Sequence, residues 1–408
     1  MLVVAEHTKL LRVFPRCRFN SMHLAIDASN IRHGGGVTHL SQLLSAANPL
    51  GAGFSKVTVW SSAATASQLP NYPWLRILSP SWVEAGIVKR MFGQKFLLGQ
   101  EMKQLGCDCL FSPGGTLPLR TKVPAITMSQ NMLPFEPEEA KRFGRWSLMR
   151  FKMWLLRQFQ MSSFNRADGL IFLTEYARAG VTNWLRQAKD LYAVIPHGVE
   201  SRFAARSEIQ SNSKNYSNQA PFTFLYVSLL MPYKHQIEVA KAANVLRRSG
   251  YPIRVRFVGA NWGSYGQQFC ELLKKLDPKK EFLEWPGSLP FSSLHAEYNV
   301  ADAFIFASSC ENLPNILLEA MAAGLPIACS NRGPMQEILN DAGVYFDPLN
   351  VSEIAEAMRI LFDNFDLRLD LGTQASMLSR TYSWQNCAEQ TFQFIAEVAM
   401  KRTIYQAV

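Results

Sequence analysis

Hydrophobic and polar positions alternate along the chain in two successive series of short apolar runs, separated by longer amphipathic stretches. Short runs rich in Val, Ile, Leu and Phe are typical of strands that a parallel sheet buries on both faces. The amphipathic stretches predict helices, such as 234–250, which ends in a glycine. The predicted strands are 23–29, 56–60, 109–112, 124–128, 169–173 and 192–196 in the first series, and 222–228, 253–259, 281–285, 303–308 and 326–330 in the second.

A polar segment at 201–219, rich in Ser, Asn and Gln, separates the two series and is typical of a linker. Two such series predict an α/β fold class with two doubly wound, Rossmann-like domains, at 22–200 and 220–384. The cleft between the domains is the expected ligand site. A last amphipathic helix is expected at about 385–408.

The start of the chain is not predicted to belong to either domain. Its charged residues interrupt the apolar run that a secretion signal needs, so we expect residues 1–21 to be a disordered extension. Met1 and Met22 are both candidate natural starts, and a short amphipathic arm is the alternative. Seven cysteines without a CxxC pair favour the cytoplasm.

Charge is distributed unevenly over the chain. Residues 1–200 contain 23 Lys and Arg against 12 Asp and Glu, whereas residues 201–408 contain 19 against 20. The first half is therefore expected to face an anionic partner. The segment 141–160 combines six cations, no acids and several aromatic residues. It predicts a helix lying on an anionic membrane, or else one that packs its aromatic residues on the first sheet. No nucleic-acid module is present, so no nucleic-acid partner is predicted.

The stretch ENLPNILLEA contains two glutamates at the carboxyl end of a predicted strand. Glu311 is predicted in the loop, Asn312 as the N-cap of the next helix, and Glu319 inside that helix. A helix N-terminus favours anions, and carboxylates accept hydrogen bonds from sugar hydroxyls. The arrangement therefore suits a nucleotide sugar, with its diphosphate at the helix end and one glutamate each on the hexose and the ribose.

This stretch and its flanks closely resemble the family four retaining glycosyltransferases. The resemblance includes the E-x7-E signature, SNRGPMQEILNDAGVYFDPLN after it and HLAIDASNIRHGGGVTHLSQLL in the first half, and covers nearly all of 22–400. It implies the GT-B fold, with the last helix crossing back to the first domain. It also implies a retaining transfer from a nucleotide-diphosphate sugar in bacterial polysaccharide synthesis. The positive charge of the first half and the helix expected at 141–160 lead us to expect a glycan or lipid-linked acceptor at the inner face of the plasma membrane.

The resemblance also implies roles for individual residues. Glu311 would contact the transferred sugar beside the reacting carbon, and Lys234 would neutralise the diphosphate, so both are candidate catalytic residues. Glu319 would bind the ribose hydroxyls. The other donor-binding candidates are Gly35, Gly36, Leu289, Asn312, Leu313 and Asn315.

Two departures from the family pattern concern the charge and the acid–base chemistry of the site. Leu229 stands where many members have an arginine, and Arg332 is the candidate substitute. Gln130 and Asn131 stand where many members have a His-Asp pair, and neutral amides hydrogen-bond but do not titrate. With His197 they are the acceptor-side candidates. These departures keep two alternatives open: a non-catalytic GT-B binding or scaffold protein, and a nucleotide-sugar epimerase.

The sequence predicts no cofactor and no metal site. It contains no DxD pair, no HxxxH pair and no Cys/His cluster. The HGGGV loop lacks the GxGxxG spacing of a dinucleotide-binding loop, which argues against a nicotinamide enzyme. The donor sugar nucleotide is therefore expected to be a substrate, bound without metal.

Overall fold

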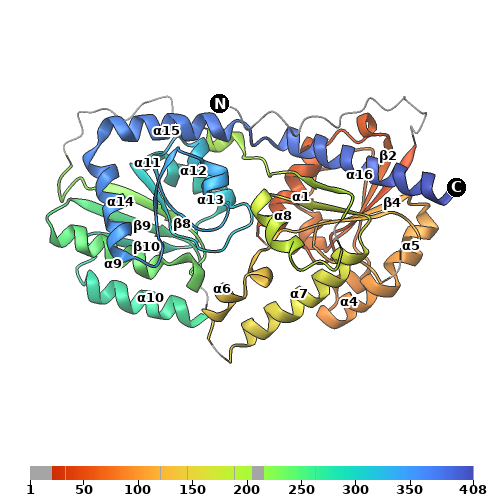
Figure 1. The fold of residues 1–408 in the computed structure, drawn as a ribbon, viewed down its shortest axis with the longest axis horizontal. Coiled ribbons are helices and arrows are strands. Elements are labelled where there is room, and N and C mark those ends of the chain that lie inside the picture. Colours follow the sequence, from red (N-terminus) through yellow and green to blue (C-terminus); the bar gives the residue numbers. More distant parts are fainter. Residues whose placement is uncertain are drawn as a thin grey trace.

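The chain folds into two α/β units that lie side by side, as the ribbon in Figure 1 shows. The computed structural model describes residues 21–32, 34–119, 121–144, 146–187, 189–204, 216–261 and 263–407, with backbone only for 403–407. The predicted extension, apart from Ser21, and residues 205–215 of the predicted linker lie outside the described residues.

The first unit is built on a seven-stranded sheet with the order β3-β2-β1-β4-β5-β6-β7, in which all pairs are parallel. Its central strands are fully buried, as their continuous apolar sequences predicted. The strands are β1 (Met22–Asp27), β2 (Phe54–Trp60), β3 (Leu75–Leu78), β4 (Cys109–Ser112), β5 (Ala125–Met128), β6 (Gly169–Phe172) and β7 (Tyr192–Val194).

The second unit is built on a six-stranded parallel sheet with the order β10-β9-β8-β11-β12-β13. Its strands are β8 (Phe222–Val227), β9 (Ile253–Val258), β10 (Leu283–Gly287), β11 (Ala303–Phe306), β12 (Ile327–Ser330) and β13 (Gly343–Phe346). The predicted fold class is confirmed. The sequence missed β3 and β13, because both are edge strands that are only partly buried. Arg76 interrupts the apolar run of β3, and that of β13 is only Val344–Phe346.

Helices cover both sheets. Those of the first unit are α1 (Gly35–Ala46), α2 (Ala63–Ala66), α3 (Ser81–Glu84), α4 (Ile87–Phe96), α5 (Leu98–Leu105), α6 (Pro137–Lys141), α7 (Leu148–Arg166) and α8 (Glu175–Thr182). Those that follow the linker are α9 (Gln236–Arg248), α10 (Gly263–Leu276), α11 (Leu294–Val300), α12 (Asn315–Ala322), α13 (Met335–Leu339), α14 (Val351–Asp363), α15 (Phe365–Ser379) and α16 (Trp384–Ala407). Short 3₁₀ turns include η3 (Ser201–Phe203) and η4 (Pro232–Lys234).

The single helix predicted over 141–160 is wrong in its extent. Gly144 adopts a left-handed conformation with φ 99°, which interrupts the helical structure and separates α6 from α7. Ser147 then caps α7, because its side chain accepts a hydrogen bond from the amide of Met149. The helix therefore starts at Leu148 and continues to Arg166.

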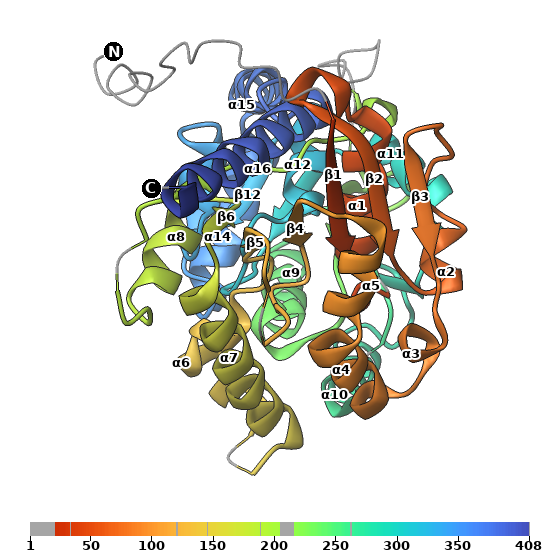
Figure 2. The same ribbon diagram turned by 90° about the vertical axis from the view of Figure 1, so that its right-hand side faces the viewer.

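The last helix, α16, packs against α1 of the first unit, and Figure 2 shows it lying along that unit. The two chain crossings between the units meet where the amide of Val199 donates to the carbonyl of Tyr382 at 3.0 Å. Gly198 has to be glycine at this crossing, since a Cβ there would lie 2.1 Å from the backbone nitrogen of Trp384. No helix in the described part of the chain is long and apolar enough to cross a bilayer.

Candidate functional site

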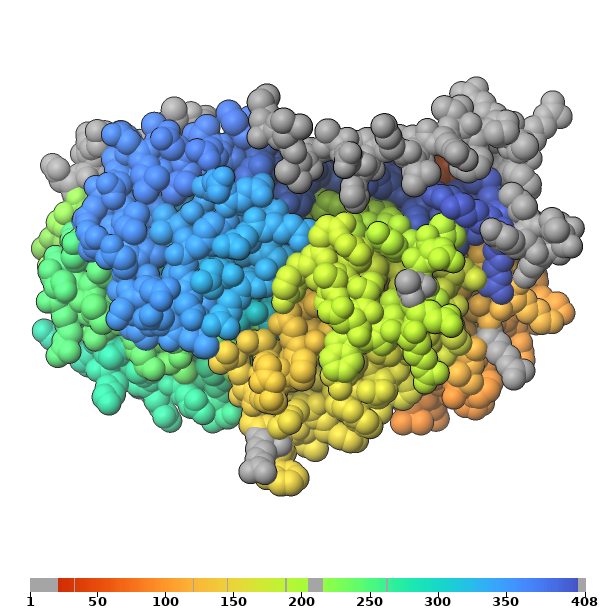
Figure 3. Space-filling view, in the orientation of Figure 1, coloured from red at the N-terminus to blue at the C-terminus, as the bar shows by residue number. Residues whose placement is uncertain are grey.

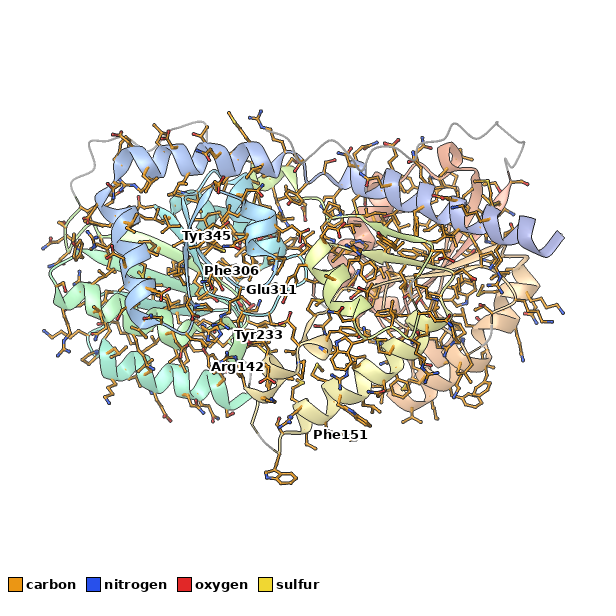
Figure 4. All side chains as sticks on the ribbon, viewed as in Figure 1. Arg142, Phe151, Tyr233, Phe306, Glu311 and Tyr345 are labelled. Carbon is orange, nitrogen blue, oxygen red and sulfur yellow. The ribbon has the colours of Figure 1, made fainter. Side chains whose placement is uncertain are left out.

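Lys234 and Glu311 meet at the junction of the two units, on the second unit's side. Lys234 ends η4, Glu311 follows β11, and the lysine Nζ forms an ion pair with Glu311 Oε1. The side chains are only 10% and 13% exposed. The amide of Ser309 donates to the carbonyl of Tyr233 at 2.9 Å and so joins the two loops. Figure 4 shows Glu311 and Tyr233 beside this junction.

The helix after Glu311 begins later than predicted. Pro314 is the N-cap of α12 and Asn315 its first residue, so the prediction of Asn312 as the N-cap is wrong. The side chain of Asn312 instead donates to the carbonyl of Ser129 at 2.9 Å, across the junction. Pro314 has no N–H, so any anion at this helix end is bound by the amides around it.

Glu319 lies inside α12 and is buried. Its Oε2 accepts a hydrogen bond of 2.8 Å from the hydroxyl of Tyr298. Burial raises the pKa of Glu319 to about 7, although the Tyr298 hydroxyl and the positive charge of Arg202 favour the ionised form. A carboxyl with this pKa changes its charge near neutral pH.

The glycine loop of the first unit faces this helix end across the junction. Gly34, with φ 67°, precedes α1, which begins at Gly35. A Cβ on Gly35 would lie 3.7 Å from Asn315 Nδ2, and one on Gly36 would lie 3.6 Å from Gln130 Oε1. The fold therefore brings the predicted donor-side and acceptor-side residues together.

Gln130 belongs to a polar and aromatic group behind the glycine loop. Its Nε2 lies 3.3 Å from Nδ1 of His39, whose ring is 4.9 Å from that of His197. Both rings also contact Trp384 at the start of α16. Burial lowers the pKa of His39 to about 4 and that of His197 well below its usual value, so both rings are neutral. Asn131 instead turns back to accept from the amide of Leu133 at 3.0 Å.

Several buried side-chain atoms near the junction have no hydrogen-bond partner among the described residues. Ser129 Oγ, Asn312 Oδ1 and Asn315 Oδ1 are such atoms, as are His39 Nε2, His197 Nδ1 and Trp384 Nε1 behind the glycine loop. Buried polar atoms are normally satisfied, so unsatisfied ones gathered at an interdomain junction indicate a place for a polar ligand. The sequence analysis did not predict a role for Ser129. Its position directly before the candidate Gln130 was the one sequence feature that could have pointed to it.

Two glutamates that the sequence did not single out also lie beside the loop that contains Ser309 and Glu311. The hydroxyl of Tyr176 donates to Glu136 at 2.6 Å, and Ser309 Oγ donates to Glu139 at 2.5 Å. Arg142 pairs with Glu139 at 2.6 Å. Burial raises the pKa of Glu136 to about 7, and the nearby carboxylates act in the same direction. The available signal was the acidic FEPEE segment that follows the fourth predicted strand of the first series.

The remaining predicted residues lie around this centre. Arg332, the candidate substitute cation, is already paired with Asp347 at 3.0 Å, and Leu229 is exposed. Leu313 is buried, and Leu289 is partly buried in the loop after β10. Among the described residues, no three His, Cys, Asp or Glu side chains form a group that could hold a metal ion.

Comparison with known proteins shows related sequences and related folds. O-antigen chain mannosyltransferase B of Escherichia coli is 27% identical over 236 residues, which cover 56% of this chain and 60% of that protein. The GDP-mannose-dependent alpha-(1-6)-phosphatidylinositol monomannoside mannosyltransferase of Mycobacterium tuberculosis is 26% identical over 270 residues, covering 61% of this chain and 66% of that protein. The matches thus span less than two thirds of either relative.

A solved structure shares the fold of most of the chain. The glycosyltransferase from Rickettsia africae superposes with a TM-score of 0.69 at 15% identity, covering 93% of this chain and 99% of that one. At this identity the likeness concerns the fold alone. Residues 208–377, which include Lys234, Glu311 and Glu319, match the family model described as glycosyl transferases group 1. The chain thus resembles this glycosyltransferase family in its second unit, and its fold is the GT-B arrangement of two Rossmann-like units.

Proposed function

We propose that this protein transfers a sugar, with retention of configuration and without a metal, from a nucleotide-diphosphate donor to a glycan or lipid-linked acceptor. The observation that carries the proposal is the Lys234–Glu311 ion pair, which lies beside unsatisfied atoms of Asn312 and Asn315. A cation, a carboxylate and a helix N-terminus in one place fit a diphosphate joined to a hydroxyl-rich sugar.

The proposed chemistry uses these groups in the order in which charge develops. As the bond from the anomeric carbon to the diphosphate oxygen breaks, its electrons pass to the diphosphate, and Lys234 and the start of α12 stabilise the added charge. Glu311 orients the sugar through its hydroxyls. The acceptor oxygen bonds to the anomeric carbon on the same face, and its proton passes to the departing diphosphate.

Contacts across the junction support a closed reaction site. Asn312 donates to the carbonyl of Ser129, and the carboxylate of Glu337 accepts from the amides of Glu175 and Tyr176 at 2.7 and 2.8 Å. In a closed state these contacts exclude water, which limits donor hydrolysis.

The relatives suggest which donor to examine first. Two of them are mannosyltransferases by name, and one of these is named as GDP-mannose-dependent. We therefore propose GDP-mannose as the first candidate donor.

A thermal-shift screen with GDP-, UDP- and ADP-sugars tests donor binding, because a ligand bound only to the folded state raises its stability by mass action. We expect one nucleotide class to raise Tm, and the same donor to yield free nucleotide in the presence of glycan acceptors. Glu311→Gln should retain most of the shift and lose most of the turnover. No shift with any sugar nucleotide would overturn the proposal.

A non-catalytic binding protein is the second candidate, favoured by the exposed Leu229 and the uncharged Gln130. The same screen separates the two. A donor-dependent shift without transfer or hydrolysis supports the binding protein, whereas nucleotide release that Glu311→Gln abolishes supports the enzyme.

We further propose that the acceptor is presented at an anionic membrane surface, with α7 as the contact. Phe151 is 60% exposed and Trp154 49% exposed on this helix, while Met153, Met161 and Phe164 face the core. The aromatic residues therefore do not all pack on the sheet. Figure 3 shows α7, in yellow, at the lower surface of the molecule. Arg145 of the predicted segment lies outside the described residues.

A further inference from the structure

The first unit contains a groove between α3 and α4 that the proposed transfer chemistry does not use. Its volume is about 510 Å³, within the range of about 300–1,000 Å³ that small-ligand sites occupy. Apart from Ser81 and Lys89, its lining is apolar. The lining residues are Ser81, Trp82, Ala85, Val88, Lys89, Phe92 and Leu97.

Trp82 forms part of the groove wall, and its side chain is held in place by its neighbours. Its indole Nε1 donates to Glu101 at 2.9 Å, and Glu101 also accepts from Trp60 at 2.6 Å. Gly93 of α4 lets the helix pack directly on this ring, because a Cβ there would lie 2.4 Å from the indole. The indole is therefore held by both contacts and cannot swing outward to fill the groove.

The apolar face of α4 points away from the core. Val88 is 77% exposed and Phe92 58% exposed, whereas Gly93 and Gln94 are buried. An amphipathic helix normally buries its apolar face, so this reversed arrangement indicates a surface that binds something apolar. The exposed apolar side chains of α4 are Ile87, Val88, Met91, Phe92 and Phe96.

The charges around the groove favour an anionic group on the occupant. The sequence of α4 contains Lys89, Arg90 and Lys95 and no acidic residue. Glu84, at the end of α3, accepts a hydrogen bond from the amide of Ala63 at 2.5 Å. The rim is therefore positive, and an apolar chain with a phosphate would match both its surface and its charge.

The groove is also connected to the glycine loop of the proposed site. Arg90 Nε donates to Asn30 Oδ1 at 3.2 Å, and the guanidinium of Arg32 donates to the carbonyl of Val83. Asn30 and Arg32 lie in the segment between β1 and α1 that leads to Gly35. Both walls of the groove are therefore hydrogen-bonded to the segment that leads to the glycine loop.

We propose that this groove holds the apolar chain of a lipid-linked acceptor, with the phosphate of the lipid beside Lys89 and the sugar end directed toward Gly35. This inference rests on the proposed function and assigns part of the acceptor to a defined place. It concerns a single chain entering the groove, which differs from the contact of α7 with a bilayer surface.

Calorimetric titration of the full chain with decyl phosphate, kept below its micelle concentration, tests the groove. Val88→Glu should weaken binding at least tenfold, while Val245→Glu, a matched change at an exposed valine of α9, should change it less than twofold. Lys89→Gln should weaken the binding of decyl phosphate more than the binding of the uncharged decyl maltoside. Inorganic phosphate alone should not bind measurably to the parent protein or to any of the three variants.

Several outcomes would overturn the inference. Equal affinities of Val88→Glu and the parent protein would place the chain elsewhere. If Val88→Glu loses vesicle binding and the parent protein does not bind monomeric decyl phosphate, the surface is a bilayer contact. If Val88→Glu changes self-association, the surface is an interface between copies of the chain. The donor thermal shift, measured in parallel, reports the proposed function separately, because Val88 lies outside the donor site.

Discussion

The two units present their proposed functional residues in contrasting states. In the second unit, Lys234 is paired with Glu311, and Glu319 with Tyr298, in surroundings that exclude most water. In the first unit, α4 and α7 carry exposed apolar side chains among cations, at the lower edge of the unit in Figures 1 and 2. The comparison suggests that donor chemistry depends on a few preorganised side chains, whereas acceptor capture depends on a surface.

Removal of the Lys234 charge should have the largest effect. Lys234→Met leaves the carboxylate of Glu311 without its cation and removes the charge that would stabilise the leaving diphosphate. We expect kcat to fall by about 10²–10³, comparable to the loss of one oxyanion-stabilising group. Because the pair is largely buried, the free energy of unfolding should also fall, by about 3 kcal/mol. Steady-state kinetics and denaturant unfolding measure the two effects.

Lys275→Met is the matched control, since Lys275 is exposed in the last turn of α10 in the same unit. It should leave both quantities near their original values. Turnover of Lys234→Met within a factor of two of the parent protein would contradict the role of Lys234 and weaken the contrast between the units.

Glu319 should give an intermediate effect that depends on pH. Its folded-state pKa of about 7 lies above the ordinary value of 4.5, so the stability associated with the protonated carboxyl is complete below pH 4.5 and is lost as pH rises through 7. Relative to Glu319→Gln, the parent protein should therefore lose roughly 3 kcal/mol between these pH values. Thermal unfolding of both proteins at pH 4.5, 6 and 8 measures this difference.

Donor binding should change in the opposite direction. In the proposed ribose site the ionised carboxylate would accept hydrogen bonds from the ribose hydroxyls best, so the donor KM of the parent protein should fall as pH rises from 6 to 8. Glu319→Gln should lose this dependence and show a KM about tenfold higher at pH 8, the cost of one charged hydrogen bond. A parallel pH profile of KM in both proteins would exclude Glu319 from the ribose site.

The sequence predicted local features better than contacts between the units, for a physical reason. A parallel sheet forces continuous apolar runs, and the E-x7-E spacing places both glutamates around one short helix, so neighbours in sequence become neighbours in the site. The contacts of Asn312 with Ser129 and of Ser309 with Glu139 join residues far apart in sequence. Only the packing of one unit on the other determines them.

The outward orientation of α4 was equally invisible in the sequence. Its apolar and charged residues fit a buried amphipathic helix as well as an exposed one, and the outcome is decided by Gly93 and Gln94, which turn one side of the helix inward. For the same reason the aromatic residues of α7 left two interpretations open. Periodicity gives the faces of a helix but does not state which face meets the core.

The smallest effects are expected on the surface of the first unit, where each residue contributes only part of a membrane contact. Lys152→Gln should lower binding to anionic vesicles about fivefold at low salt, since one cation near such a surface contributes about 1 kcal/mol. Leu155→Ser should lower it by a similar or larger factor through lost apolar burial. Flotation with vesicles of increasing anionic lipid content, at low and high salt, measures both changes.

Matched substitutions in the second unit separate a membrane contact from a general change in the protein. Leu369 is 40% exposed on α15 and Leu155 is 38% exposed on α7, so Leu369→Ser removes the same side chain from an equally exposed helix. If only the α7 changes weaken flotation, and salt weakens it further by screening, the capture surface belongs to the first unit. If both leucine changes act alike, the contrast between a catalytic unit and a capturing unit fails, even where the donor chemistry of Lys234 and Glu319 holds.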